Sequence, residues 1–316
     1  MALLAFIGSP MFGDFAAAYK ALKPEEIQLN FAAISDTHLK GDAFTAIPLA
    51  AGLKDMSESE TPLDAVVIAG DITDHGEREQ WERVASTFSK HKAAENIILA
   101  AGNHDTWTTT EDGETIFGLY SEFNKKIAGR EIENMYYSCK VNGYTFIVLG
   151  SEEDHTYATF TDTQLEWLRN EMAVAALDGK PIFVISHWAI NGLHGLPYSW
   201  DLQEESDPTK GGIGEASDAV EAILKSYENV FLITGHIHLG LANDEKVGDT
   251  SYSSVESEGS FHSINLPCYT NMSQAGARTI GTGYQFEVYE DEVVLRARDF
   301  VSGTWYTLYD CTVPLV

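Results

Sequence analysis

The sequence predicts an α/β protein, in which buried strands alternate with amphipathic helices. Six short runs are almost entirely apolar, which is typical of strands covered on both faces: 29–35, 64–70, 96–102, 144–150, 181–186 and 229–235. Helical patterns follow four of these runs, over residues 77–91, 114–129, 161–177 and 215–227. Alternation of this kind favours a sheet with helices packed on its outside.

The C-terminal part has a different pattern. Residues 283–310 alternate between apolar and polar with period two, and turn residues stand at Asp291 and Gly303. This predicts an antiparallel meander that completes the sheet. No linker precedes it, so we expect residues 28–316 to form a single domain.

Residues 1–27 form a separate N-terminal segment with two interpretations. Its apolar run and the small residues 16–18 resemble the later part of a secretory signal, but no Lys or Arg precedes the run and Pro10 interrupts it. The segment is therefore either a terminal helix packed on the domain or a signal remnant. The location stays open between the cytoplasm, which the interrupted run favours, and secretion. No stretch predicts an integral membrane segment.

The composition argues against several partners. Forty-eight Asp and Glu against twenty Lys and Arg give a formal charge of −28, which repels the phosphates of nucleic acids and anionic lipids. The three cysteines are Cys139, Cys268 and Cys311, with no C-x-x-C pair, so the sequence indicates neither a disulfide framework nor a thiolate metal site.

Polar residues follow five of the six predicted strands. They are Asp36 and His38, Asp71 and Asp74, Asn103, His104 and Asp105, His187, and finally His236 and His238. Ligands of open α/β sheets bind outside the carboxyl ends of the strands, so we expect these groups to converge on one crevice. Glycines before Asp71, Asn103 and His236 allow the backbone to turn sharply there.

The chemistry of this set indicates metal ions. Carboxylates, imidazoles and an amide without a thiolate suit Mn, Fe, Zn or Co, and the set is too large for one ion. Two divalent or trivalent ions that share a carboxylate, about 3.5–4 Å apart, would use it.

The ordered motifs D-x-H, G-D-x-x-D, G-N-H-D, H and G-H-x-H span residues 36–238 and resemble the calcineurin-like metallophosphoesterase superfamily. Each motif alone is weak, but all five in order, each after a predicted strand, are specific. The resemblance implies a four-layer α/β/β/α sandwich. It also implies a phosphoester hydrolase that uses a hydroxide held between two metal ions.

The resemblance further implies a role for each residue. The first metal would be held by Asp36, His38 and His238, Asp71 would bridge, and the second would be held by Asn103, His187 and His236. His104 would face the substrate as a cation or as the acid for the leaving oxygen, with Asp74 and Asp105 orienting its ring. Helix capping is the alternative for Asp105.

The remaining aromatic and histidine residues have simpler interpretations. His194 lies in an aromatic loop and is a candidate for substrate contact. Trp188, Tyr198 and Trp200 in that loop either pack in the core or stack on a substrate ring. We expect His91, His155 and His262 on the surface.

Two departures narrow the subfamily. Protein phosphatases of this superfamily carry an Arg after G-D-x-x-D, where this chain has His75, and purple acid phosphatases place a metal-binding Tyr where it has Asp74. The segment GDITDHGE, residues 70–77, is most similar to the corresponding segment of the bacterial cyclic-nucleotide phosphodiesterase group.

The sequence thus predicts hydrolysis of a small-molecule or nucleotide-like phosphomonoester or phosphodiester. The alternatives are an inactive binding or scaffold protein on the same fold, a nuclease, or a lipid pyrophosphate hydrolase. The identity of the metals, the natural substrate and the oligomeric state stay open.

Overall fold

A computed structural model describes residues 19–107, 115–152, 158–200, 207–247, 250–270, 275–277 and 280–316. The predicted terminal helix or signal remnant in residues 1–18, and His155, lie outside the described residues.

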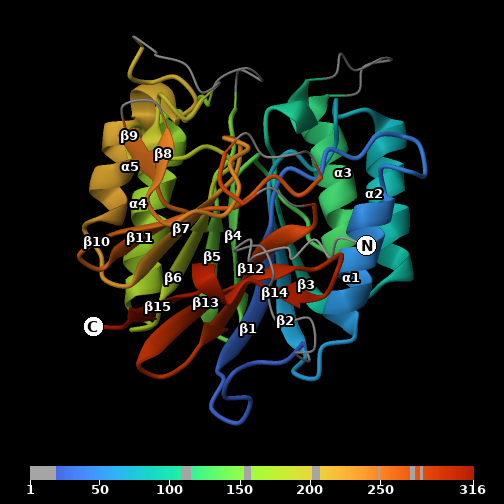
Figure 1. The fold of residues 1–316 in the computed structure, drawn as a ribbon. Coiled ribbons are helices and arrows are strands. Elements are labelled where there is room, and N and C mark those ends of the chain that lie inside the picture. Colours follow the sequence, from blue (N-terminus) through green and yellow to red (C-terminus); the bar gives the residue numbers. More distant parts are fainter. Residues whose placement is uncertain are drawn as a thin grey trace, which may run out of the picture.

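Two large β-sheets form the centre of the molecule (Figure 1). The first has the strand order β14-β13-β12-β1-β2-β3, with β15 paired to β13. Its strands are β1 (Leu29–Ile34), β2 (Leu63–Ala69), β3 (Ala94–Ala100), β12 (Thr282–Val288), β13 (Glu292–Asp299), β14 (Thr304–Trp305) and β15 (Cys311–Pro314). The β1, β2 and β3 strands are parallel, and β12 to β15 form the predicted antiparallel meander.

The second sheet has the order β10-β11-β7-β6-β5-β4. Its strands are β4 (Tyr137–Val141), β5 (Tyr144–Val148), β6 (Ile182–Ile185), β7 (Val230–Thr234), β10 (Val255–Glu258) and β11 (Phe261–Asn265). Parallel pairing joins β5, β6, β7 and β11. A small hairpin, β8 (Glu245–Val247) and β9 (Thr250–Tyr252), lies beside this sheet in Figure 1.

Helices cover the outer faces of both sheets, which confirms the predicted four layers (Figure 1). The first sheet is covered by α1 (Ile47–Ser57), α2 (Arg78–Lys90) and α3 (Ile116–Ala128), and the second by α4 (Asp162–Ala176) and α5 (Ser217–Leu224). Thr115 and Thr161 cap α3 and α4 by accepting bonds from backbone N–H groups, and Gly129 ends α3 in a left-handed conformation.

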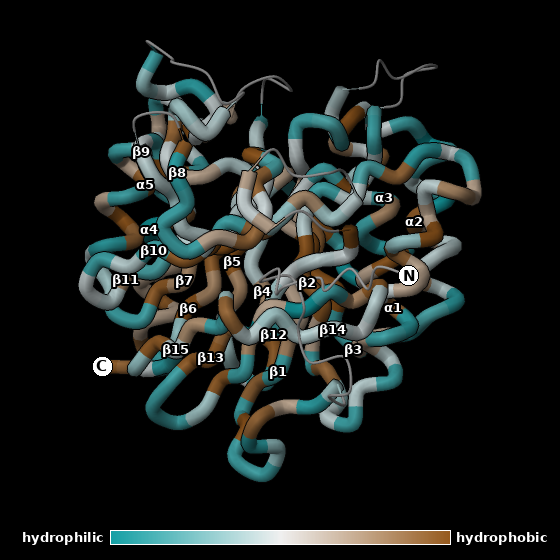
Figure 2. Tube along the Cα trace, viewed as in Figure 1, coloured by the Kyte–Doolittle hydropathy of each residue, from teal (hydrophilic) through white to brown (hydrophobic). Residues whose placement is uncertain are grey.

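Aromatic side chains join the two sheets. Phe31 of β1 stacks on Phe286 of β12 with ring centroids 4.5 Å apart, and meets Phe183 of β6 in the other sheet at 4.9 Å. Because successive side chains of a strand point to opposite faces, the neighbouring Val184 packs instead with the residues under α4 and α5. Figure 2 shows the resulting hydrophobic interior and the hydrophilic outer loops.

The structure corrects the sequence interpretation in three regions. Neither α1 nor β4 is predicted by the sequence. The Gly, Ser, Asp and aromatic content of residues 239–262 predicts a long loop, but this stretch contains β8, β9, β10 and the start of β11. His262 is consequently not a surface residue, because it lies in β11, is 5% exposed and faces the ring of Phe231. His91 ends α2 and is half-buried.

Within the part of the chain that the structure describes, every helix is too short or too polar to cross a lipid bilayer.

A buried carboxylate anchors the start of the described chain to the first sheet. Glu287 is fully buried and accepts bonds from Arg296 Nη1 at 2.9 Å, Gln285 Nε2 at 3.0 Å and the backbone N–H of Leu22 at 2.8 Å. Arg296 in turn lies over the ring of Trp305. Removing the carboxylate would leave a buried guanidinium without its counter-charge.

We therefore expect Glu287→Ala to lower the free energy of unfolding by about 3–5 kcal/mol in urea denaturation. The matched control is Glu292→Ala, which breaks a partly exposed ion pair with Lys23 and should cost less than about 1 kcal/mol. Equal losses in the two variants would contradict this account of the buried pair.

Candidate metal centre

The carboxyl ends of parallel strands from both sheets meet at one edge of the molecule. The N–H of Asp36, after β1, donates to Gly70 O after β2 at 3.0 Å. The N–H of His236, after β7, donates to Asp36 Oδ2 at 3.2 Å and so links the second sheet to the first. The strand ends that the sequence predicts to converge therefore do so.

The first group of candidate ligands lies around Asp36. Ligand atoms of Asp36, His38, Asp71 and His238 all lie within 4.8 Å of one another. His238 Nε2 is 3.1 Å from Asp36 Oδ1 and 3.1 Å from His38 Nε2. Two imidazole nitrogens and two carboxylates directed at one point form a donor set for a cation.

The second group shares Asp71 with the first. Ligand atoms of Asp71, His187 and His236 lie within 4.8 Å of one another, and all three residues are buried. His187 Nδ1–H donates to Ala69 O at 2.8 Å, which leaves Nε2 directed at Asp71 Oδ2, 3.2 Å away. A hydrogen bond from the other ring nitrogen to a backbone carbonyl fixes the tautomer that a histidine ligand needs.

Asn103 provides an independent test of whether metal ions fit here. Its Oδ1 is buried and has no hydrogen-bond partner among the described residues. The next residue, His104, donates its backbone N–H to Asp71 Oδ1 at 2.8 Å, so Asn103 adjoins the shared carboxylate. A buried amide oxygen without a donor is costly in a protein interior and suits a metal ion. The residues present therefore fit two ions that share Asp71.

The four histidines of this donor set fall into two pairs by protonation state. Burial lowers the pKa of His38 to about 4 and that of His236 well below its usual range, which leaves both rings neutral. Burial also opposes the charge of His187, but the Asp71 carboxylate outweighs it and raises the pKa of His187 to about 9. Burial likewise opposes the charge of His238, but the Asp36 carboxylate outweighs it and raises the pKa of His238 well above its usual range. Because neutral imidazole is the form that binds metals, a bound ion would have to displace a proton from His187 and from His238.

Five of the predicted ligands have backbone strain. Their φ angles are positive, at 57° for Asp36, 40° for His38, 48° for Asp71, 71° for His236 and 55° for His238. Such angles cost about 1–3 kcal/mol per residue and collect at functional sites. These left-handed backbone angles direct alternate side chains toward the same point. The residue types alone did not reveal the backbone strain.

The glycines before the ligands act mainly by making room. Gly70 has a left-handed backbone angle, φ = 91°, which a sharp turn requires. At the other two glycines the constraint is space: a Cβ on Gly102 would lie 2.2 Å from Asp71 Oδ1, and a Cβ on Gly235 would lie 1.9 Å from Ser35 Oγ. Gly102 and Gly235 have no left-handed angle, so close approach rather than a sharp turn explains them.

His104 is half-buried beside the first group. Its Nδ1 lies 2.7 Å from the backbone carbonyl of Asp74, and a carbonyl can only accept, so Nδ1 bears the hydrogen. Residue 74 thus orients the ring through its backbone. The Asp74 carboxylate lies instead 2.9 Å from His75 Nδ1 and 3.6 Å from Lys40 Nζ.

Asp105 has neither of the two contacts that the sequence suggested. Its carboxylate accepts bonds from the backbone N–H groups of Ile72 at 3.1 Å, Thr73 at 2.8 Å and Gly102 at 2.9 Å. Burial, together with the charge of Asp71, raises the pKa of Asp105 to about 6. Asp105 therefore ties the loop after β2 to the loop after β3.

The expected substrate contact of His194 is wrong. The residue is 0% exposed, and its ring nitrogens bond to Ser253 O and Ser263 Oγ, each at 2.8 Å. Both nitrogens are thereby used inside the fold. Trp188 is a core residue, whereas Trp200 stacks on His236 with ring centroids 4.4 Å apart.

The sequence interpretation missed the segment after β11. Cys268 is buried, its Sγ–H donates to Asp36 O at 3.6 Å, and Thr270 Oγ1 bonds to Thr37 O at 3.0 Å. Cys268 Sγ lies within 4.8 Å of ligand nitrogens of His38 and His238. The sequence interpretation missed this segment because it did not predict β11. That strand runs parallel to β7 and therefore ends at the same edge of the sheet.

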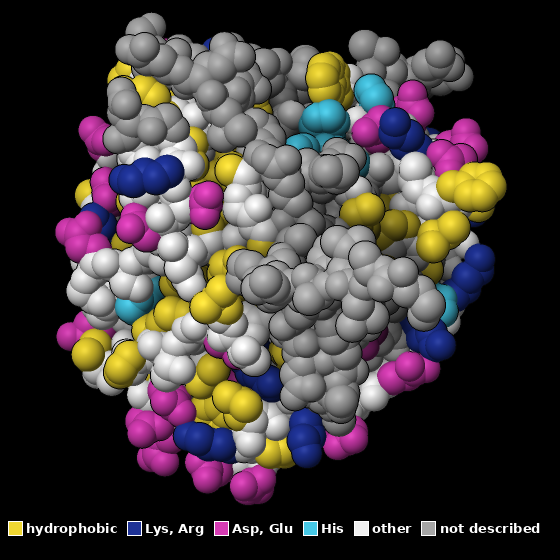
Figure 3. Space-filling model, viewed as in Figure 1, with side chains coloured by type: hydrophobic (Ala, Val, Ile, Leu, Met, Phe, Trp, Pro, Cys, Tyr) yellow, Lys and Arg dark blue, Asp and Glu magenta, His cyan; other side chains and the backbone are white. Residues whose placement is uncertain are grey.

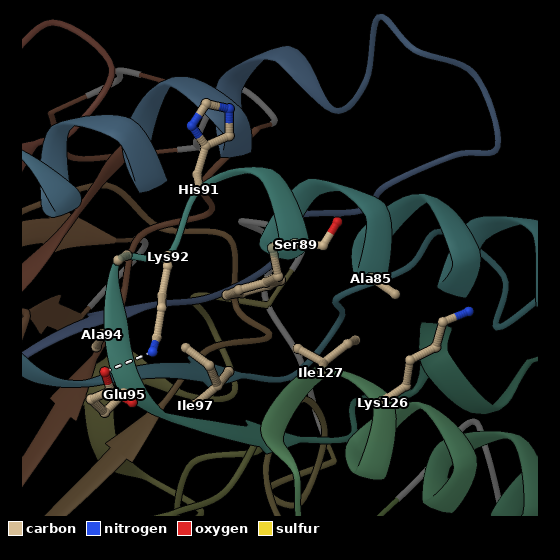
Figure 4. A pocket seen from close by; sticks show the side chains of 11 residues that line it. Ala85, Ser89, His91, Lys92, Ala94, Glu95, Ile97, Lys126 and Ile127 are labelled. Atoms are coloured by element: carbon tan, nitrogen blue, oxygen red, sulfur yellow. Dashed lines mark hydrogen bonds and ion pairs between the residues drawn. The ribbon is translucent and has the colours of Figure 1, made fainter.

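A separate cavity of about 240 Å³ lies at the other end of the first sheet (Figure 4). It is lined by His91, Lys92 and Lys126 among others, near the end of α2 and the start of β3. The candidate ligands follow the carboxyl ends of the strands, so this cavity is remote from them.

Comparisons with known proteins agree with the geometry. Residues 29–240 match the family described as calcineurin-like phosphoesterase. A probable cyclic nucleotide phosphodiesterase of Rhodococcus erythropolis is 26% identical over 215 residues, which are 65% of this chain and 63% of that protein. A cAMP/cGMP dual specificity phosphodiesterase of Mycobacterium tuberculosis is 25% identical over 227 residues, 68% of this chain and 63% of that protein. The similarity thus spans somewhat less than two thirds of these relatives.

The fold resembles that of a dimetal phosphatase from Danio rerio. The TM-score is 0.61 at 17% sequence identity, with 92% of this chain and all of the other chain covered (100%).

The glycine contacts generate a prediction about metal affinity. Gly102→Ala should weaken binding of Mn²⁺ or Zn²⁺ by about 10- to 100-fold, the loss typical when support around a metal ligand is removed. The reason is that the new Cβ displaces Asp71 and its neighbour Asn103. Calorimetric titration of the metal into the protein measures this.

The control is Gly179→Ala, where φ is +62° but nothing lies within 4 Å of the added Cβ. It should cost some stability and leave metal affinity unchanged. Wild-type affinity in Gly102→Ala would refute the role of close approach.

Proposed function

Because the chain belongs to the calcineurin-like phosphoesterase family, we propose that it hydrolyses a phosphoester of a small or nucleotide-like molecule with the help of two metal ions. The observation that supports this most is the pair of ligand groups that share the Asp71 carboxylate. The two-metal arrangement is the one that phosphatases and nucleases use for in-line displacement at phosphorus.

The proposed ligands divide between two ions. Asp36, His38 and His238 would hold the first, with Asp71 shared, and Asn103, His187 and His236 would hold the second. When bound, the ions supply positive charge for the phosphoryl oxygens and make water acidic enough to react near neutral pH. The choice among Mn, Fe, Zn and Co is part of the test.

His104 is the proposed catalytic side chain beside the ligands. Its ring meets the His38 ring edge-on at 4.6 Å between centroids, and the Asp74 carbonyl holds the Nδ1 hydrogen. Nε2 is then the atom left to protonate the leaving oxygen or to donate to a phosphoryl oxygen. Asp74 and Asp105 act as positioning residues, one through its carbonyl and the other through the loop that it braces.

The substrate class follows from charge and from the relatives. A formal charge of −28 disfavours long polyanions, so a small ester is favoured over nucleic acid. Both curated relatives named above are described as cyclic nucleotide phosphodiesterases. Each position at which the motifs place a metal ligand or the catalytic histidine carries the expected residue in this chain. This favours an enzyme over a scaffold protein.

Purified protein should hydrolyse bis-p-nitrophenyl phosphate, p-nitrophenyl phosphate or 3′,5′-cyclic AMP after addition of Mn²⁺, Fe²⁺, Zn²⁺ or Co²⁺, and a chelator should abolish the activity. His104→Ala should lower kcat by about 10²- to 10⁴-fold, the usual contribution of a general acid. Asp71→Asn should also lose bound metal, measured by elemental analysis.

The control is His91→Ala, because His91 lines the remote cavity in Figure 4 and should not affect kcat. Two results would disprove the proposal: no hydrolysis of any ester with any of these metals, or full activity in Asp71→Asn.

A further inference from the structure

An exposed tryptophan stands directly beside the proposed catalytic histidine. Trp107 is 49% exposed, which is unusual for so large an apolar side chain. Its ring meets the His104 ring edge-on, with centroids 4.8 Å apart at 80°, and lies 5.7 Å from the His75 ring at 31°. Figure 3 shows exposed histidine side chains next to a hydrophobic one at the top of the molecule.

The position of Trp107 relative to His104 is set by the backbone. His104 begins one short 3-10 turn, η1 (His104–Thr106), and Trp107 directly follows it. The N–H of Trp107 donates to His104 O at 3.4 Å. His75, on the other side, is held by Asp74 at 2.9 Å and by Gln80, whose Oε1 accepts its N–H at 2.7 Å. The indole is therefore presented at a defined distance from His104.

Exposed hydrogen-bond donors surround Asp74, the residue whose carbonyl holds the His104 ring. Lys40 Nζ lies 3.6 Å from the Asp74 carboxylate and the Lys40 side chain is 56% exposed, while His75 is 52% exposed. The Lys40 ammonium has three N–H donors, so it can donate to the Asp74 carboxylate and also to a phosphate oxygen of a ligand. An aromatic surface beside such donors matches a ligand with both a phosphate and a planar ring.

We propose that Trp107 determines specificity by stacking on a planar aromatic group of the ester, such as a nucleobase, while the phosphate lies at His104. This inference rests on the proposed function for its reacting bond, and it adds the class of ester. Stacking of a base on an aromatic side chain is sequence-tolerant, because every base has a π face. The indole should therefore improve binding of many nucleotides and add nothing for esters without a ring.

The test compares two esters with the same scissile bond. One is 3′,5′-cyclic AMP, and the other is methyl riboside 3′,5′-cyclic phosphate, in which a methoxy group replaces adenine. Trp107→Ala should raise KM for cyclic AMP by about 5- to 150-fold, the range for loss of one base stack, with kcat unchanged. Kinetics on the methyl riboside should not change. Trp107→Phe should fall between wild type and Trp107→Ala.

Leu177→Ala is the matched control, because Leu177 is 85% exposed at the end of α4 and should change neither substrate. Equal losses on both esters in Trp107→Ala would overturn the inference, since the indole would then only support His104. Unchanged kinetics on both would overturn it as well.

A binding measurement separates this inference from the proposed function. Calorimetric titration with adenosine 5′-monophosphate needs no turnover, and its affinity should fall in Trp107→Ala and hold in Leu177→Ala. If the wild type hydrolyses no ester but shows this pattern, the proposed function fails and the stacking role stands. If the nucleotide binds both wild type and Trp107→Ala equally, or binds neither, the stacking role is wrong.

Discussion

The candidate site depends on one physical constraint, the close approach of two parallel strand edges that belong to different sheets. Gly235 after β7 has no room for a Cβ because Ser35 and Asp36 after β1 lie against it. The His236 N–H bond to Asp36 Oδ2 crosses the same boundary. Both ligand groups include residues from each sheet, so neither forms unless the phenylalanine interface packs the sheets together.

This arrangement is held against local preferences. Left-handed backbone at non-glycine ligands and closely spaced imidazoles are both unfavourable by themselves. They persist because the strands behind them are buried, with β1, β6 and β7 entirely inaccessible or nearly so. Asp105 adds a further restraint by binding the backbone of two loops at once. The stability of the core thus offsets the strain that orients the ligands, as is typical of preorganised sites.

Much of the fold could be predicted because its signals are local. Continuous apolar runs predict the parallel strands, and period-two alternation predicts the meander from β12 onwards. The segment 239–262 shows where this fails. β11 pairs with β7, which lies well before it in the sequence, and Val255–Glu258, which pairs with β11, is too polar to signal a strand. His262 was misplaced for this reason, since its burial comes from pairing with β7.

By itself the sequence determined which predicted strand each ligand follows, the chemical types of the ligands and the glycines before three of them, because each is a property of a short segment. The tertiary structure alone decided which side chains meet. His194 and His104 are both candidates for substrate contact in the sequence, yet one has its ring nitrogens bonded in the interior and the other stands beside the ligands. Asp105 braces loops, and Trp107 stands exposed beside His104. Side-chain direction depends on how two sheets pack across hundreds of residues, and no local pattern contains that information.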